Sequence, residues 1–141
     1  MREGRKFPAC STYKEKTGQK VGVAVGGLDI NNNPLKSAEI YFDINGEWMT
    51  IAPLRSAYGM GTLNVISNRL LHFGGLGDNG ASDLAFVHND QTGWHLSNLK
   101  TSSPKSGHVS VAVKVGQLSM NNLGRSSCSI FNRLSKWKCI F

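Results

Sequence analysis

The fold is decided by residues 21–54, which read VGVAVGGLDINNNPLKSAEIYFDINGEWMTIAPL. Short apolar runs rich in Val, Ile, Phe and Tyr alternate there with clusters of Gly, Asn, Asp and Pro, which is typical of strands joined by turns. Asn45-Gly46 predicts a two-residue hairpin, because both central positions of a type I′ turn need a positive φ. No segment of the chain keeps a clear apolar period of about 3.6 residues. The stretch therefore predicts an all-β protein.

The pattern of this stretch occurs twice. A diglycine closes an apolar run at Gly26-Gly27 and again at Gly74-Gly75, and Trp48 and Trp94 follow the two diglycines. The ordered recurrence of spaced features indicates a repeat protein. We therefore expect four antiparallel strands in each unit, near 20–26, 37–43, 46–52 and 58–66 in the first and near 68–74, 82–88, 92–97 and 107–115 in the second.

The repeated residues have a structural interpretation. A four-stranded unit cannot bury both faces of its sheet alone, so it must stack against copies of itself. The diglycines are expected where a strand ends beside a crowded axis with little room for a side chain. The two tryptophans would fill the space between neighbouring units with a large apolar surface. The alternative for the diglycines is a pair of ordinary loop glycines.

The order of apolar run, Gly-Gly, Ser-x-Glu-x-Tyr-x-Asp, Trp and Leu resembles the kelch repeat. Residues 21–54 are the better copy, and a second copy runs from Leu70 to Leu99. Residues 4–10, GRKFPAC, resemble a preceding inner strand in which Pro8 stands where the family has histidine. The resemblance implies kelch-type antiparallel four-stranded blades that form an incomplete β-propeller.

This resemblance divides the chain into a kelch-repeat region, 1–115, and a basic tail, 116–141. The region would hold blades near 20–66 and 68–115, with residues 4–13 a remnant strand of a preceding repeat. Propellers usually have four to eight blades. Two blades and part of a third therefore imply a fragment, or a chain that self-associates to cover its open blade faces.

The basic character of the chain belongs to its two ends. The net charge is +7, yet residues 21–99 contain three basic and seven acidic residues. A domain that binds a polyanion should carry its positive charge on the folded face that contacts phosphate, so no nucleic-acid partner is expected. The alternative is phosphate contact by the basic and aromatic residues of 114–141. The tail is expected to be disordered or outside the repeat, or else to form a short amphipathic segment from Ile130 to Trp137.

The sequence also bears on location. No apolar stretch reaches the roughly 18 residues of a spanning helix, and the first residues lack the apolar run of a signal peptide. Cys10, Cys128 and Cys139 are too few and too scattered for a disulfide scaffold, and no CxxC pair offers a zinc site. A cytoplasmic protein without a membrane partner is therefore predicted.

The kelch resemblance implies a protein–protein interaction module. In an antiparallel meander alternate loops open at the same end, so the loops after each diglycine and after each tryptophan would share one face. The candidate partner-binding residues on it are Asp29, Asn31, Asn32, Asn33, Arg55, Asp78, Asn79 and Lys105. The alternatives are simple turn chemistry for the asparagines and, for Arg55, pairing with a neighbouring blade.

The resemblance leaves several roles open. It implies a ubiquitin-ligase substrate receptor or, alternatively, an actin-binding protein, and a galactose-oxidase-like enzyme with copper ligands is a further alternative. Strand or repeat positions explain the four histidines, His72, His88, His95 and His108, better than metal ligation does. The chain contains no nucleophile elbow, zinc-binding helix or phosphate loop. We therefore predict no catalytic activity, cofactor or metal site.

Overall fold

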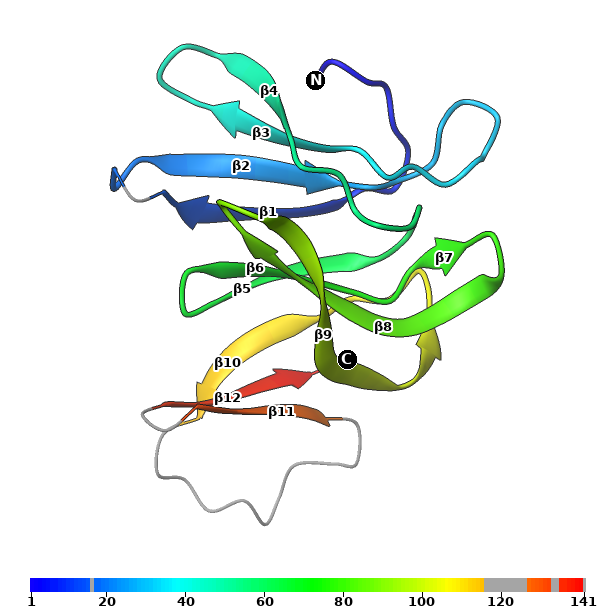
Figure 1. The fold of residues 1–141 in the computed structure, drawn as a ribbon, viewed down its shortest axis with the longest axis vertical. Coiled ribbons are helices and arrows are strands. Elements are labelled where there is room, and N and C mark those ends of the chain that lie inside the picture. The colour runs from blue at the N-terminus through cyan, green and yellow to red at the C-terminus, as the bar shows by residue number, and fades with distance from the viewer. Residues whose placement is uncertain (16, 116–126, 133–134, 141) are drawn as a thin grey trace.

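The structure, a computed structural model, describes residues 1–15, 17–115, 127–132 and 135–140. These residues form antiparallel strands in three sheets and no helix, which confirms the prediction of an all-β chain. Figure 1 shows the sheets one above another along the longest axis of the molecule. The described ranges hold no helix with the length and apolar character needed to cross a membrane.

The first sheet is a meander in which each strand pairs with the next. Its strands are β1 (Ala9–Lys14), β2 (Lys20–Val25), β3 (Ala38–Phe42) and β4 (Glu47–Ile51). The last three lie where the sequence predicted strands. Val21, Val23 and Val25 share one face of β2 and are buried, as the two-residue period of a strand requires.

The connection between β3 and β4 differs from the predicted two-residue hairpin. Phe42 pairs with Glu47, so the connection has four residues, 43–46. Of these only Gly46 takes a positive φ, +69°, and its N–H donates to the Phe42 carbonyl at 2.9 Å. A type I′ turn needs a positive φ at both central residues, and Asn45 does not adopt one.

The second sheet has five strands. They are β5 (Thr62–Ile66), β6 (Arg69–Phe73), β7 (Leu76–Gly77), β8 (Gly80–Asn89) and β9 (Gly93–Lys105). β5, β6, β8 and β9 form a meander like that of the first sheet, and β7 makes a small hairpin with the beginning of β8. The two sheets therefore share a four-stranded antiparallel plan.

The structure corrects the predicted grouping of strands. β5, expected within 58–66 as the last strand of the first unit, pairs with β6 and opens the second sheet. The strand expected in 4–13 is β1, which pairs with β2 in register and opens the first sheet instead of being a remnant of another repeat. The cause is the Ser67-Asn68 turn. Both residues take a positive φ, +50° and +59°, and so close a tight hairpin between β5 and β6.

The third sheet contains β10 (Val111–Val115), β11 (Ser127–Asn132) and β12 (Ser135–Ile140). β12 lies between β10 and β11 and pairs with both, so the strand expected within 107–115 does not close the second sheet. The tail is expected to be disordered, outside the repeat, or amphipathic at helix-like spacing. Residues 127–132 and 135–140 are instead paired strands, with Ile130 directly opposite Trp137, and the position of the tail outside the repeat stays a prediction. The rest of the tail, including Leu134, lies outside the described residues.

Two apolar clusters hold the sheets against one another. The larger joins Val21, Val23 and Ile40 of the first sheet to Leu70 and other residues of the second, among them Leu63, Phe86 and Trp94. The smaller lies on the opposite face of the second sheet, where Phe73 is fully buried and Ala112 of β10 packs against the cluster. The second sheet is therefore covered on both faces.

The diglycines have the same backbone conformation in both sheets. The φ angles are +60° and +105° at Gly26-Gly27 and +61° and +109° at Gly74-Gly75. A Cβ atom on Gly26 would lie 2.1 Å from the Tyr58 carbonyl oxygen, and one on Gly74 would lie 2.7 Å from the Lys105 oxygen. Both positions therefore combine a left-handed conformation with close backbone approach, which only glycine accommodates.

The first strands of the three sheets begin beside one another. Phe7, Met60 and Gly107, each just before such a strand, all take a positive φ. The Met60 N–H donates to the Phe7 carbonyl at 3.1 Å, and the Gly107 N–H donates to the Met60 carbonyl at 2.8 Å. This chain of backbone hydrogen bonds sets β1, β5 and β10 in equivalent positions.

Candidate functional site

The loops after the two diglycines lie at the same end of the molecule, which we call the diglycine end (residues 28–37, 52–58 and 76–80; Figure 1). The segment after β4 lies between the other two loops. The Leu54 N–H donates to the Lys36 carbonyl at 2.8 Å, and the Gly59 N–H donates to the Leu76 carbonyl at 2.9 Å. The loops are thus fixed to one another by backbone hydrogen bonds.

The loop after the first diglycine is a closed turn built on Asp29. Its Oδ1 accepts the N–H groups of Asn31 and Asn33 at 2.8 Å, and its Oδ2 accepts the Asn33 side chain at 2.9 Å. The side-chain hydrogen bond from Asn33 is the main cause that lowers the pKa of Asp29. Asn32 takes φ +67°, and its side-chain Oδ1 accepts a hydrogen bond from the Lys6 ammonium at 2.6 Å. These contacts give Asp29, Asn32 and Asn33 a part in shaping the turn.

Arg55 and the second diglycine loop flank a groove. A cavity of about 340 Å³ is lined by residues 56–58 and 77–84, which include Asp78 and Asn79 in the turn between β7 and β8. Arg55 is exposed and immediately precedes this lining. The structure therefore brings the segment that follows Arg55 together with the Asp78 turn in one cavity.

Lys105 ends β9 beside the second diglycine. Its carbonyl accepts the Gly75 N–H at 2.8 Å, and its ammonium donates to the Ser103 hydroxyl at 3.2 Å. The Tyr58 carbonyl accepts the Gly27 N–H in the same way at 2.9 Å. Lys105 and Tyr58 thus hold equivalent places behind the two diglycines.

A buried ion pair, which the sequence did not reveal, supports the first diglycine loop. The Arg5 guanidinium, whose side chain is fully buried, lies 2.5 Å from Oε1 of Glu39 and also donates to the carbonyls of Gly26 and Ser37 at 2.7 and 3.0 Å. Burial raises the pKa of Glu39, but hydrogen bonds from Arg2, Arg5 and Glu3 outweigh it, so the pKa is lowered. Arg5 therefore ties both ends of the loop to the sheet.

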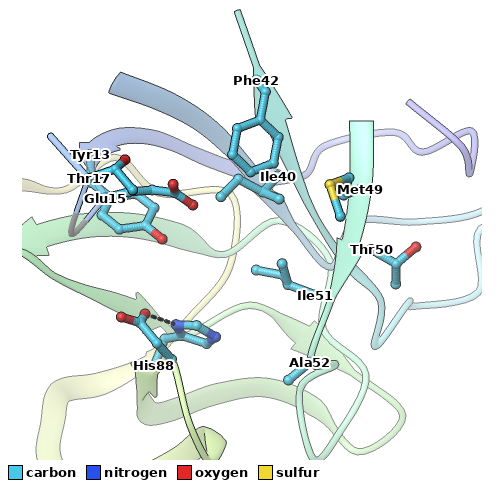
Figure 2. A pocket seen from close by; sticks show the side chains of 11 residues that line it. Tyr13, Glu15, Thr17, Ile40, Phe42, Met49, Thr50, Ile51, Ala52 and His88 are labelled. Carbon is cyan, nitrogen blue, oxygen red and sulfur yellow. Dashed lines mark ion pairs between the residues drawn. The ribbon is translucent and has the colours of Figure 1, made fainter. Parts of the chain in front are cut away.

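The protein also has a cleft that sequence reasoning missed. It has a volume of about 460 Å³ and lies between the first sheet and the end of β8. Figure 2 shows Tyr13 and His88 on one side and Phe42, Met49 and Ile51 on the other. Its apolar wall and polar rim can bury an apolar group. No motif links these residues, because they come from turns and strands far apart in the sequence.

Charge in this cleft acts on two titratable side chains. Burial raises the pKa of the Tyr13 phenol, and the carboxylates of Asp90 and Glu15 raise it further. Burial lowers the pKa of His88, and the Asp90 carboxylate, 3.7 Å from its Nδ1, opposes that shift. His88 also packs on Trp94 with ring centroids 5.0 Å apart. The neutral imidazole is thus favoured in the packed position.

The four histidines have different immediate contacts. His88 packs on Trp94, His95 hydrogen-bonds Thr92 at 2.7 Å, and His108 hydrogen-bonds Thr62 at 3.2 Å. His72 is fully buried between Tyr58 and Phe86, and neither of its ring nitrogens has a hydrogen-bond partner among the described residues. Across the part of the chain that the structure describes, no three His, Cys, Asp or Glu side chains gather to hold a metal.

Lowering the pH from 6.5 to 4 is expected to reduce the free energy of unfolding by about 3 kcal/mol through His72 alone. Burial, together with the charge of His108, lowers the pKa of His72 from 6.5 to about 4. The unfolded chain therefore takes up a proton first, so the stability present above pH 6.5 is lost as the pH falls toward 4. Urea denaturation at pH 7 and pH 4 measures the loss.

The variant His72→Leu removes this titration and isolates its share of the pH dependence. We expect the difference in stability between the two pH values to shrink by about 3 kcal/mol in that variant. His95→Gln, at a histidine that is not buried, is the control and should leave the difference unchanged. Equal pH dependence of His72→Leu and the unaltered protein would contradict the prediction.

No protein-family model matches the chain, and no curated protein matches it either.

Proposed function

We propose that this chain is part of a kelch-type β-propeller that binds a protein partner through its diglycine end. The observation that carries the proposal is the equivalence of the two diglycine units. Their φ angles agree within a few degrees, and each second glycine donates to a carbonyl of the segment that precedes the next sheet. Repetition of one four-stranded unit around neighbouring first strands is the plan of a propeller.

The diglycine end suits protein recognition because its loops are held rigidly and carry polar and apolar groups together. Ile30 is 87 % exposed at the tip of the Asp29 turn, and Phe7, whose neighbour Lys6 pairs with Leu28, is exposed beside it. The Asp78 turn lines the neighbouring groove, and Arg55, which is exposed, immediately precedes Ser56 in its wall. Apolar side chains ringed by polar ones are typical of protein interfaces, and a fixed loop loses little entropy on binding.

The test compares two exposed isoleucines at opposite ends of the molecule. Ile30→Asp places a charge at the diglycine end, whereas Ile44→Asp places it in the connection between β3 and β4, where Ile44 is 83 % exposed. Proteins that co-purify with the tagged chain are quantified for each variant. Ile30→Asp, and separately Arg55→Glu, should lower recovery of a specific partner at least tenfold.

The matched control decides the location of the surface. Ile44→Asp should recover that partner as well as the unaltered chain does. If it loses the partner while Ile30→Asp and Arg55→Glu keep it, the proposal that the diglycine end binds the partner is wrong. The roles implied by the kelch resemblance, in ubiquitin ligation or actin binding, stay predictions until such a partner is known.

A further inference from the structure

One face of the first sheet is open over part of its area; Ala24 and Glu39 on the same face are buried, Glu39 against Arg2, Glu3 and Arg5. The second sheet shows what covers a face of this kind. The open face carries Cys10, Thr12, Gly22, Tyr41 and Trp48. Cross-strand pairing places Thr12 opposite Gly22, Gly22 opposite Tyr41 and Tyr41 opposite Trp48, so these residues form a continuous row across all four strands. Cys10 and Thr12 are exposed, and Gly22, Tyr41 and Trp48 are half-buried.

The equivalent row of the second sheet is covered more fully, since Leu70 and Trp94 are buried and Val65 and His88 are half-buried. Val65 pairs with Leu70 and His88 with Trp94, and Trp94 is only 3 % exposed because the first sheet covers it. The aromatic pairs at the ends of the two rows are alike. The ring centroids are 5.2 Å apart in Tyr41–Trp48 and 5.0 Å apart in His88–Trp94. The open face is thus the same surface without its covering sheet.

The covering surface has an exposed counterpart at the other end of the chain. Ala9 is buried on the face by which the first sheet covers the second. Val109 holds the equivalent place before β10, two residues after Gly107 as Ala9 is two residues after Phe7. Ser110 hydrogen-bonds Asn64 at 2.5 Å, so by strand alternation the residues on either side of it turn away from the second sheet. Val109 and Val111 are 85 % and 53 % exposed.

We propose that two copies of this chain associate, each placing the Val109–Val111 face of its third sheet on the open face of the other's first sheet. The contact repeats the interface that the first and second sheets already make within one chain. Such a head-to-tail contact either closes into a ring or continues as a fibre. Two copies supply six sheets, and no other number of three-sheet copies gives a ring of the usual four to eight blades.

This closed ring rests on the proposed propeller architecture, and the mass of the particle tests it directly. Sedimentation equilibrium of the unaltered protein should give twice the 15.3 kDa of one chain. Thr12→Glu puts a charge in the middle of the open face and should raise the dimer dissociation constant at least tenfold. Ser102→Glu, at another exposed hydroxyl on β9, is the matched control and should leave the dimer unchanged.

A second measurement follows the open face itself. Cys10 is an exposed free thiol on that face. In a Cys128→Ser, Cys139→Ser background its reaction with a maleimide should slow at least tenfold as protein concentration rises through the dissociation constant, and Thr12→Glu should abolish the slowing.

Three results would overturn the dimer. They are a monomer at all concentrations, particles that grow without limit, and a dimer that resists Thr12→Glu. A monomer that still unfolds cooperatively and still loses its partner through Ile30→Asp would refute the dimer and leave the proposed function standing. A dimer whose partner binding is insensitive to Ile30→Asp and Arg55→Glu would support the dimer and refute binding through the diglycine end.

Discussion

Arg5→Ala is expected to lower the free energy of unfolding by about 3–5 kcal/mol, because it leaves a buried carboxylate without its partner. The Arg5 side chain is fully buried and the Glu39 side chain is 2 % exposed, so water cannot solvate the Glu39 carboxylate once Arg5 is gone. The Gly26 carbonyl also loses the Arg5 hydrogen bond, and the Ser37 carbonyl keeps only the Gly26 N–H. Chemical denaturation measures the change, and faster hydrogen exchange in residues 28–37 should accompany it.

Two further variants separate the ion pair from general damage at the N-terminus. Lys6→Ala removes an exposed cation whose ammonium contacts Ile30 and Asn32, and it should cost less than about 1 kcal/mol. The double variant Arg5→Met, Glu39→Leu removes both buried charges and should be more stable than Arg5→Ala. Equal stability of Arg5→Ala and Lys6→Ala would show that the pair contributes nothing.

Gly26→Ala is expected to destabilise the protein by about 3–4 kcal/mol, because left-handed strain and a lost backbone hydrogen bond add together. The new methyl group would lie 2.1 Å from the Tyr58 carbonyl oxygen, which must move. That carbonyl accepts the Gly27 N–H, so its movement also breaks the link between the two sheets. The shift in denaturation midpoint at constant slope gives the cost.

The matched control is Gly80→Ala, where the backbone is strained but the space is open. Gly80 takes φ +95°, and within the described part of the chain no atom lies within 4 Å of its added Cβ. Gly80→Ala should therefore lower the free energy of unfolding by about 1–2 kcal/mol, which is the strain of alanine in a left-handed conformation. Gly74→Ala should resemble Gly26→Ala, since the two glycines have the same φ. If Gly26→Ala destabilises the protein no more than Gly80→Ala does, the Tyr58 backbone moves aside at no cost and the prediction is wrong.

Local sequence predicted where most strands and turns lie. β2, β3, β4, β6, β8 and β9 each lie in or across a predicted segment, because alternation and turn residues act over a few neighbouring positions. The recurrence of Gly-Gly and Trp also predicted that two similar units exist. The recurrence did not predict where one unit ends and the next begins, because that boundary depends on the Ser67-Asn68 turn and the pairing of β5 with β6.

The candidate sites were less predictable. The residues of the first diglycine loop could be named, yet sequence alone did not show that Asp29 ties the turn together or that Arg5 supports it. Arg5 and Glu39 are 34 positions apart, and Tyr13 and His88, which line one cleft, belong to different sheets. Each such contact depends on how whole sheets are placed, so no spacing rule reveals it.

By itself the sequence determined the strand character, the turns and the repetition of a diglycine–tryptophan unit, because φ preferences and side-chain alternation are properties of neighbouring residues. Tertiary structure alone decided which strands pair, which aromatic pair is buried and that two strands of the tail join β10. These outcomes follow from long-range backbone pairing and from burial between sheets, whose free energy depends on residues far apart in the chain.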